Sequence, residues 1–257
     1  PALQAALREG ECAGEVDSTN ARLLARPAPP PGQFDFLTAE YQTAGRGRRG
    51  RSWLAPPGGA VCLSWSWSFE ALSPSMGALS LAIGVSALRA LRSVGIDCVQ
   101  LKWPNDLVTS EGKLGGILIE MRTESGGPVH VVIGIGVNVA LPADLQATLA
   151  QMGTAAADLA GLAAPAPAPA RADLTAALIR EGIGAVREFA ASGFAPFLDE
   201  YQAADALRDK PVRLQGSGPV DDGVARGVDA DGALRVERQG QVHRIIAGEV
   251  SVRTAST

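Results

Sequence analysis

A short segment rich in arginine and glycine carries the strongest chemical signal in the chain. Residues 45–53 read GRGRRGRSW, and their arginines are Arg46, Arg48, Arg49 and Arg51. Guanidinium groups make paired, charge-assisted hydrogen bonds to phosphate oxygens, while glycine lets a backbone come close to a ligand. Trp53 adds a flat ring on which a base can stack. The segment predicts a mobile loop that binds a phosphorylated ligand; a solvated basic turn or a short nucleic-acid-binding segment would use the same residues.

Two further polar clusters stand where elements begin or end. Ser18, Thr19 and Asn20 precede an Ala/Leu run, so they can cap a helix or hydrogen-bond a ligand at its positive end. The sequence KWPND, residues 102–106, follows a short strand, which Pro104 ends because it has no N–H to donate. Both clusters are compatible with ordinary caps and turns as well as with ligand binding.

Glycine-containing strands supply the remaining polar signal. Residues 113–121 open with KLGG, and residues 129–139 read VHVVIGIGVNV. A glycine inside a strand often marks a place where another group comes close to the backbone. Asn138 is polar among apolar neighbours, so it either satisfies backbone groups or reads the edge of a ligand.

Hydrophobic spacing predicts the elements that must position these groups. Alternating residues predict strands at 34–42 and 61–69, and the serines of the second strand indicate that only one of its faces is buried. Helices are predicted at residues 3–9, 75–94, 173–190 and 194–204. An Ala/Pro-rich stretch, 153–171, is predicted to be an exposed connector. Beyond residue 206, short strands between Gly and Asp turns predict a small all-β barrel.

Composition limits the classes of function. The chain has 257 residues and a formal net charge of -4, so no overall positive field attracts DNA or an anionic membrane. Three scattered cysteines and two histidines argue against a disulfide framework and a structural zinc site, and they favour a reducing cytoplasm. No apolar run approaches the length of a membrane span, and the first residues lack the pattern of a signal peptide.

In their order along the chain, these motifs resemble those of the biotin protein ligases, enzymes that activate biotin with ATP and attach it to a lysine of a carrier domain. The motifs are Ser18-Thr19-Asn20, Gln42 with GRGRRGRSW, KWPND, KLGGILIE and GIGVNV. The resemblance covers residues 17–140 densely and returns weakly at AGEVSVR, residues 247–253. Each motif is weak alone, but the set in this order is specific.

The resemblance implies a role for each matching residue. The residues expected around biotin are Ser18, Thr19, Asn20, Gln42, Gly45, Arg46, Gly47, Arg48, Lys113 and Gly116. Those expected around ATP are Arg48, Arg51, Trp53, Asn138 and Arg253. Catalytic roles are implied for Lys113, Arg46, Arg48 and Asp106. Lys113 would bridge the biotin carboxylate and the α-phosphate, and Asp106 would hold Mg²⁺ or help remove the proton of the attacking lysine.

The resemblance also implies the fold and the reaction. The expected fold is α+β: residues 1–205 form a mixed, mostly antiparallel sheet backed by helices, of the class II synthetase-like type, and residues 206–257 form an SH3-like barrel. The expected enzyme is a ligase that forms a C–N bond. With ATP, biotin and Mg²⁺ it would make biotinyl-5'-AMP, and biotin would then pass to a biotin carboxyl carrier protein of acetyl-CoA carboxylase or a related carboxylase.

The chemistry of that reaction agrees with the residue types. A carboxylate and an α-phosphoryl group repel each other, so Lys113, the arginines and Mg²⁺ must offset their charge. Transfer from a mixed anhydride needs a deprotonated lysine rather than a covalent enzyme intermediate, in keeping with the scarcity of histidine. We expect the arginine segment to close over the adenylate and limit its hydrolysis.

Partners and rivals are also predicted. Some biotin ligases carry an N-terminal winged helix that represses transcription; 16 residues precede Asp17, so we expect no DNA partner here, and no membrane partner. The sequence is compatible with a homodimer formed by edge strands. Lipoate or octanoate transferases share the implied fold and are the nearest enzymatic alternative. A nucleic-acid-binding module that uses the Arg-Gly segment is the alternative from another class.

Overall fold

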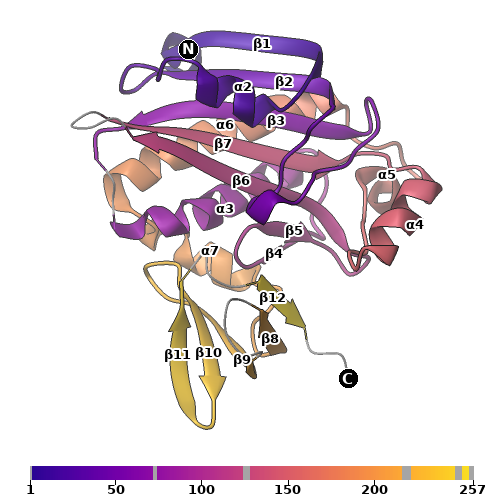
Figure 1. Cartoon of the computed structure of the whole chain (residues 1–257), viewed down its shortest axis with the longest axis vertical. Helices are drawn as coiled ribbons and strands as arrows, with labels where there is room; N and C mark the ends of the chain where they lie inside the picture. The colour runs from indigo at the N-terminus through magenta and orange to yellow at the C-terminus, as the bar shows by residue number, and fades with distance from the viewer. Residues whose placement is uncertain (1, 72–73, 124–127, 216–220, 247–250, 255–257) are drawn as a thin grey trace.

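A seven-stranded sheet forms the larger part of the molecule (Figure 1). The structure is a computed structural model that describes all residues except 1, 72–73, 124–127, 216–220, 247–250 and 255–257. The strands are β1 (Leu7–Val16), β2 (Phe34–Gln42), β3 (Ala60–Phe69), β4 (Gln100–Lys102), β5 (Asp106–Val108), β6 (Lys113–Thr123) and β7 (Val129–Asn138). Their order is β1-β2-β3-β7-β6-β5-β4. Only β1 and β2 run parallel, which confirms the predicted mixed, mostly antiparallel sheet.

Helices cover the two faces of the sheet unequally. They are α1 (Ala2–Ala6), α2 (Thr19–Ala25), α3 (Leu79–Ser93), α4 (Ala143–Gln151), α5 (Leu159–Ala163), α6 (Arg171–Ser192) and α7 (Leu198–Ala203), with 3-10 turns η1 (Arg48–Gly50), η2 (Pro74–Ala78) and η3 (Ala195–Phe197). The long helices α3 and α6 lie behind the sheet, and the short α2 lies in front of it (Figure 1). None of the helices in the described residues has the length and apolar character needed to cross a membrane.

The core lies between the sheet and the two long helices. Trp65 of β3 is 1% exposed, and a Cβ on Gly182 of α6 would lie 2.7 Å from its ring. The glycine therefore lets α6 pack closely against the sheet, and it makes the back face a rigid support for the front face.

Three predictions about these elements were wrong in part. Residues 7–9 belong to β1 rather than to a helix at 3–9, because an edge strand that is mostly exposed needs no hydrophobic alternation. All ten residues of β3 are buried, so its serine face is covered as well; Ser64 and Ser68 hydrogen-bond Thr19 and the Pro29 carbonyl. The predicted connector 153–171 contains the short helix α5.

A second, antiparallel sheet follows the first. Its strands are β8 (Pro211–Gln215), β9 (Asp221–Val228), β10 (Leu234–Arg238), β11 (Gln241–Ile245) and β12 (Ser251–Thr254), in the order β11-β10-β9-β8-β12. This confirms the predicted small C-terminal β unit. Trp103, which is buried, donates its indole N–H to the Gly232 carbonyl at 3.1 Å. The KWPND turn is therefore tied to the connection between β9 and β10 of the second sheet.

Candidate functional site

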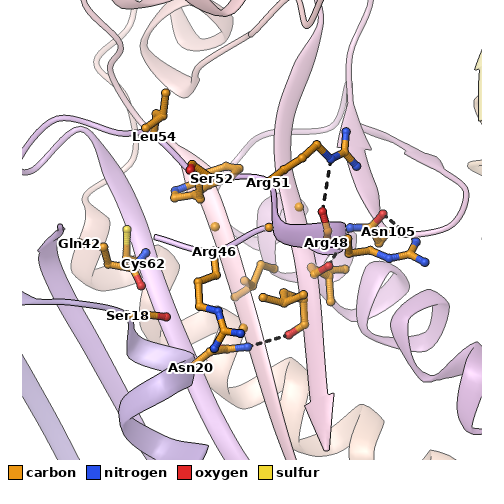
Figure 2. A pocket seen from close by; sticks show the side chains of 18 of the residues that line it. Ser18, Asn20, Gln42, Arg46, Arg48, Arg51, Ser52, Leu54, Cys62 and Asn105 are labelled. Carbon is orange, nitrogen blue, oxygen red and sulfur yellow. Dashed lines mark hydrogen bonds between the residues drawn. The ribbon is translucent and has the colours of Figure 1, made fainter. Parts of the chain in front are cut away.

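A cavity of about 310 Å³ opens on the front face of the large sheet (Figure 2). The predicted site residues that line it are Ser18, Thr19, Asn20, Gln42, Arg46, Gly47, Arg48, Arg51, Trp53, Lys113, Gly116 and Asn138. Gly45 and Asp106 do not line it but touch residues that do: the Gly45 carbonyl accepts from the Trp53 N–H at 2.9 Å, and Asp106 is bonded to Lys113. Arg253 lies on β12, and its side chain falls outside the described residues.

The register of the sheet explains why the floor of the cavity is hollow. Residues paired directly across strands point their side chains to the same face. Ser64 of β3 pairs with Gly134 of β7, and in the next row Cys62 pairs with Gly136, which pairs with Gly116 of β6. Glycines therefore occupy the middle of both rows.

Groups from outside the sheet fill part of that hollow. A Cβ on Gly134 would lie 2.2 Å from Asn20 Oδ1, and a Cβ on Gly136 would lie 2.7 Å from the Trp53 ring. Both contacts are closer than real Cβ atoms allow, so each glycine makes room for one side chain. This agrees with the expectation that another group comes close to the backbone where a glycine lies inside a strand.

A cluster of buried, neutral polar groups forms one end of the cavity. Thr19 donates its backbone N–H and its hydroxyl to Gln42 Oε1, at 2.8 and 3.1 Å. Ser64 Oγ lies 2.7 Å from Thr19 Oγ1 and 2.6 Å from Asn20 Oδ1. Ser18 caps α2 by accepting the Ala21 N–H at 3.4 Å. These residues therefore cap the helix and line the cavity at once, so the two alternatives left open by the sequence are compatible.

The arginine loop (residues 45–53) folds back on itself beside the cavity. Arg46 and Ser52 form a β-bridge, and the Gly47 N–H donates to the Arg51 carbonyl at 2.7 Å. Arg46 points toward Asn20 in Figure 2, and its guanidinium lies 3.0 Å from Glu120 Oε1. Arg48 donates to Asn105 Oδ1 at 3.4 Å. The loop thus presents cations to the cavity from the side opposite the sheet.

Lys113, which lines the cavity away from Gln42, pairs with Asp106 just outside it. Lys113 Nζ lies 2.5 Å from Asp106 Oδ1, and both side chains are about a quarter exposed. Burial, together with the neighbouring charge of Arg49, lowers the pKa of Arg48 from its ordinary value. The charged form of Arg48 is therefore incompletely compensated, and an anion placed beside it would relieve that cost. Among the residues that the structure describes, no group of three or more His, Cys, Asp or Glu side chains could hold a metal by itself.

Asn138 satisfies backbone groups, which is the first of its two alternatives. Its amide nitrogen donates to the carbonyls of Lys113 and Ala157, at 3.3 and 3.0 Å, so it holds the start of β6 against the segment that precedes α5. Its side chain also lines the cavity. The amide oxygen is the group that it can still offer to a ligand.

Several lining residues were not identified from the sequence as site residues. They are Ser52, Leu54, Cys62, Leu63, Ser64, Asn105, Ile117, Leu118, Gly134, Ile135, Gly136, Leu149, Met152, Thr154 and Ala156. The serine alternation in 61–69 indicated a polar face on this strand, but it did not single out Ser64 from Ser66 and Ser68. Leu149 and Met152 lie on or just after α4, which carries no motif, so no sequence signal pointed to them.

Comparison with known proteins defines the class of this protein. Residues 15–138 match the Biotin/lipoate A/B protein ligase family, and residues 209–253 match the Biotin protein ligase C terminal domain. The chain is 38% identical over 240 residues to the bifunctional ligase/repressor BirA of Escherichia coli, covering 93% of this chain and 73% of that protein. It is 32% identical over 227 residues to the biotin--[acetyl-CoA-carboxylase] ligase of Paracoccus denitrificans, covering 85% of this chain and 90% of that one.

A solved structure agrees with this assignment. The biotin protein ligase of Aquifex aeolicus in complex with biotin and ATP superposes on this chain with a TM-score of 0.79 at 25% sequence identity. The match covers 96% of this chain and 100% of that one. The chain belongs to the biotin protein ligase family, as its motifs predicted.

Proposed function

We propose that this protein activates biotin with ATP to biotinyl-5'-AMP and then transfers biotin to a lysine of a biotin carboxyl carrier domain. The observation that carries this proposal is a single cavity with two chemically different ends. Thr19 and Gln42 offer neutral hydrogen-bonding groups at one end, and Arg48 and Lys113 offer cations at the other. Biotin is complementary to this arrangement, because its neutral ureido ring and its negatively charged carboxylate stand at opposite ends of an apolar chain.

The first half of the reaction joins two anions. A biotin carboxylate oxygen attacks the α-phosphorus of ATP, the bond from that phosphorus to the bridging oxygen breaks, and pyrophosphate leaves with the electron pair. Lys113 bridges the carboxylate and the α-phosphate, and Arg48 and Arg51 offset the charge on the phosphates. Groups fixed in place before the reaction stabilise such charge without reorganisation.

Asp106 is the residue we assign to magnesium. Its Oδ1 is engaged by Lys113, which leaves the second carboxylate oxygen as a ligand of the type that Mg²⁺ prefers. A single protein carboxylate is a common arrangement when Mg²⁺ takes its other ligands from nucleotide phosphates and water. When bound, the ion would withdraw negative charge from those phosphates.

In the second half, a carrier lysine attacks the acyl carbon of biotinyl-5'-AMP. A C–N bond forms, the bond from the acyl carbon to the phosphate oxygen breaks, and AMP leaves. The amine must lose a proton, and Asp106 is the carboxylate beside the reacting end that can help remove it. Trp53, Asn138 and Arg253 would hold the nucleotide, and the arginine loop would close over the adenylate to exclude water.

The proposal extends to organisation and surroundings. We assign the catalytic domain to residues 1–205 and the SH3-like domain to residues 206–257. The carrier would be that of acetyl-CoA carboxylase or a related carboxylase, and the reaction would take place in the cytoplasm. The exposed edge strand β1 is compatible with pairing into a homodimer.

The test is to mix the protein with biotin, Mg-ATP and a biotin carrier domain, and to follow pyrophosphate release and the mass of the carrier. Lys113→Ala and Arg48→Ala should each lower labelling by roughly 100-fold, the usual cost of removing one charge-stabilising donor. Lys210→Ala is the matched control, since Lys210 is exposed and does not line the cavity. Labelling by Lys113→Ala at the rate of the unaltered protein would contradict the assigned role.

Lipoate is the substrate that separates this function from its nearest alternative. The match of residues 209–253 to the C-terminal domain of biotin protein ligases supports biotin. In an isothermal titration, biotin should displace any bound lipoate and should not be displaced by it. The reverse order of affinity would favour a lipoate ligase.

A further inference from the structure

One carboxylate outside the cavity connects the arginine loop to α2. Glu120 of β6 forms an ion pair through Oε1 with the guanidinium of Arg46 in the arginine loop, at 3.0 Å. Its Oε2 accepts a hydrogen bond from the side-chain amide of Asn20 in α2, also at 3.0 Å. The two carboxylate oxygens therefore hold two elements that lie on different sides of the cavity.

The position of Glu120 shows that it acts through these neighbours. It stands four residues after Gly116 on β6, so its side chain is on the cavity face, yet it does not line the cavity itself. Its side chain is 18% exposed, while that of Arg46 is 49% exposed. If the arginine loop moved away, a largely buried carboxylate would lose its cation, which is unfavourable.

The two partners of Glu120 both line the cavity. In the proposed function, the ureido end of biotin lies beside Asn20, and Arg46 covers it from the loop. A ligand that holds Asn20 in place therefore also holds the carboxylate in the position that Arg46 needs.

We propose that Glu120 is a positioning residue that links occupancy of the biotin end to closure of the arginine loop. The inference rests on the proposed function, because it concerns retention of the adenylate made in the same cavity. Glu120 contacts neither the reacting atoms nor the ligand. Its loss should therefore weaken the closed state of the loop more than it slows the chemical steps.

Glu120→Gln is the informative substitution, because it keeps an amide oxygen for Asn20 and removes the charge that attracts Arg46. Two quantities are measured: the rate at which preformed biotinyl-5'-AMP leaves the protein without carrier, and the rate of trypsin cleavage within the arginine loop when the adenylate is bound. Both rates should rise about fivefold, which is the largest change expected from the loss of one half-exposed ion pair. Glu120→Asp should give a smaller increase, since it retains the charge.

Glu237→Gln is the matched control. Glu237 also lies on a strand and pairs with an arginine, Arg226, at 2.8 Å, but it belongs to the second sheet. Both rates should stay at the level of the unaltered protein. A loss of thermal stability equal to that of Glu120→Gln without faster adenylate release is the expected behaviour of a purely structural ion pair.

A double-mutant cycle tests the contact itself and covers the case in which Glu120→Gln folds poorly. Arg46→Gln removes the same ion pair from the exposed side, and it should speed adenylate release by at least the same factor, because Arg46 also covers the ligand. Adding Glu120→Gln to Arg46→Gln should change the rate little, and fully additive effects would overturn the inference. If the unaltered protein labels carrier while Glu120→Gln releases adenylate and is cleaved at normal rates, this inference alone fails. If the unaltered protein makes no adenylate, both proposals fail.

Discussion

Gly134→Ala is the substitution that most directly tests how the neutral end of the cavity is built. Gly134 lies in β7 and does not have a positive φ, so alanine costs nothing in backbone conformation there. The added Cβ would lie 2.2 Å from Asn20 Oδ1 and 2.9 Å from its Cγ. The Asn20 side chain is 3% exposed and must therefore move within a packed environment.

The energetic cost of displacing Asn20 follows from the hydrogen bonds that its side chain makes. These join it to Ser64 Oγ at 2.6 Å, the Leu118 carbonyl at 3.2 Å and Glu120 at 3.0 Å. A net hydrogen bond is worth about 1 kcal/mol, so losing two of them costs about 2 kcal/mol. Because the proposed function needs Asn20 in its hydrogen-bonded position when biotin binds, the same cost lowers kcat/KM for biotin roughly 30-fold, since about 1.4 kcal/mol is a factor of ten.

The assay is pyrophosphate release at biotin concentrations below KM, with a thermal melt in parallel. Gly184→Ala is the matched control: Gly184 lies in α6, and a Cβ there would meet nothing within 4 Å. It should leave kcat/KM unchanged and stabilise the helix slightly. A Gly134→Ala protein with biotin kinetics within about twofold of normal would refute the reasoning, whether or not its melting temperature fell, because the Asn20 cluster would then be structural only.

Two further predictions concern single titratable groups. Burial raises the pKa of Asp205 above its ordinary value of 3.8, so the folded protein holds that proton more tightly than the unfolded chain. The stability that this gives is fully present below the unfolded pKa and is lost as pH rises through the folded pKa. Asp205→Asn keeps an oxygen for the Leu207 N–H, so urea unfolding should show its stability rising relative to the unaltered protein as pH increases from about 4. Burial likewise raises the pKa of the Cys62 thiol, so mass spectrometry should find iodoacetamide modifying the exposed Cys12 and Cys98 first, with biotin slowing the reaction of Cys62 further; equal rates at all three would contradict this.

The sequence predicted those parts of the fold whose burial pattern is one-sided or strongly apolar. The strand at 34–42 was predicted with the bounds that it has, and the helices at 75–94 and 173–190 correspond to α3 and α6. The edge strand β1 was missed because only one neighbour pairs with it and most of its residues face solvent. A strand of that kind needs no hydrophobic periodicity, so pattern alone cannot find it.

The candidate site shows a different limit. Ser18, Thr19 and Asn20 were identified by type, and the structure brings them to the cavity with Gln42 and Lys113. The residues that hydrogen-bond them were not identified from the sequence, because such a bond can join distant positions. The bond from Ser64 to Asn20, for example, joins residues 44 positions apart. Nothing local distinguishes Ser64 from Ser66 or Ser68; only the strand register places it opposite Gly134.

The glycines of β7 bring these two limits together. A glycine in a buried strand weakens the strand by itself, so Gly134 and Gly136 indicated in advance that something must approach the sheet there. The group that approaches comes from another part of the chain, so the sequence of the strand does not identify it. Asn20 of α2 lies over Gly134, and Trp53 of the arginine loop lies over Gly136. The two glycines thus divide the floor of one cavity into a half under the Asn20 amide and a half under the Trp53 indole. An alanine at each should separate the halves experimentally, with Gly134→Ala raising KM for biotin and Gly136→Ala raising KM for ATP.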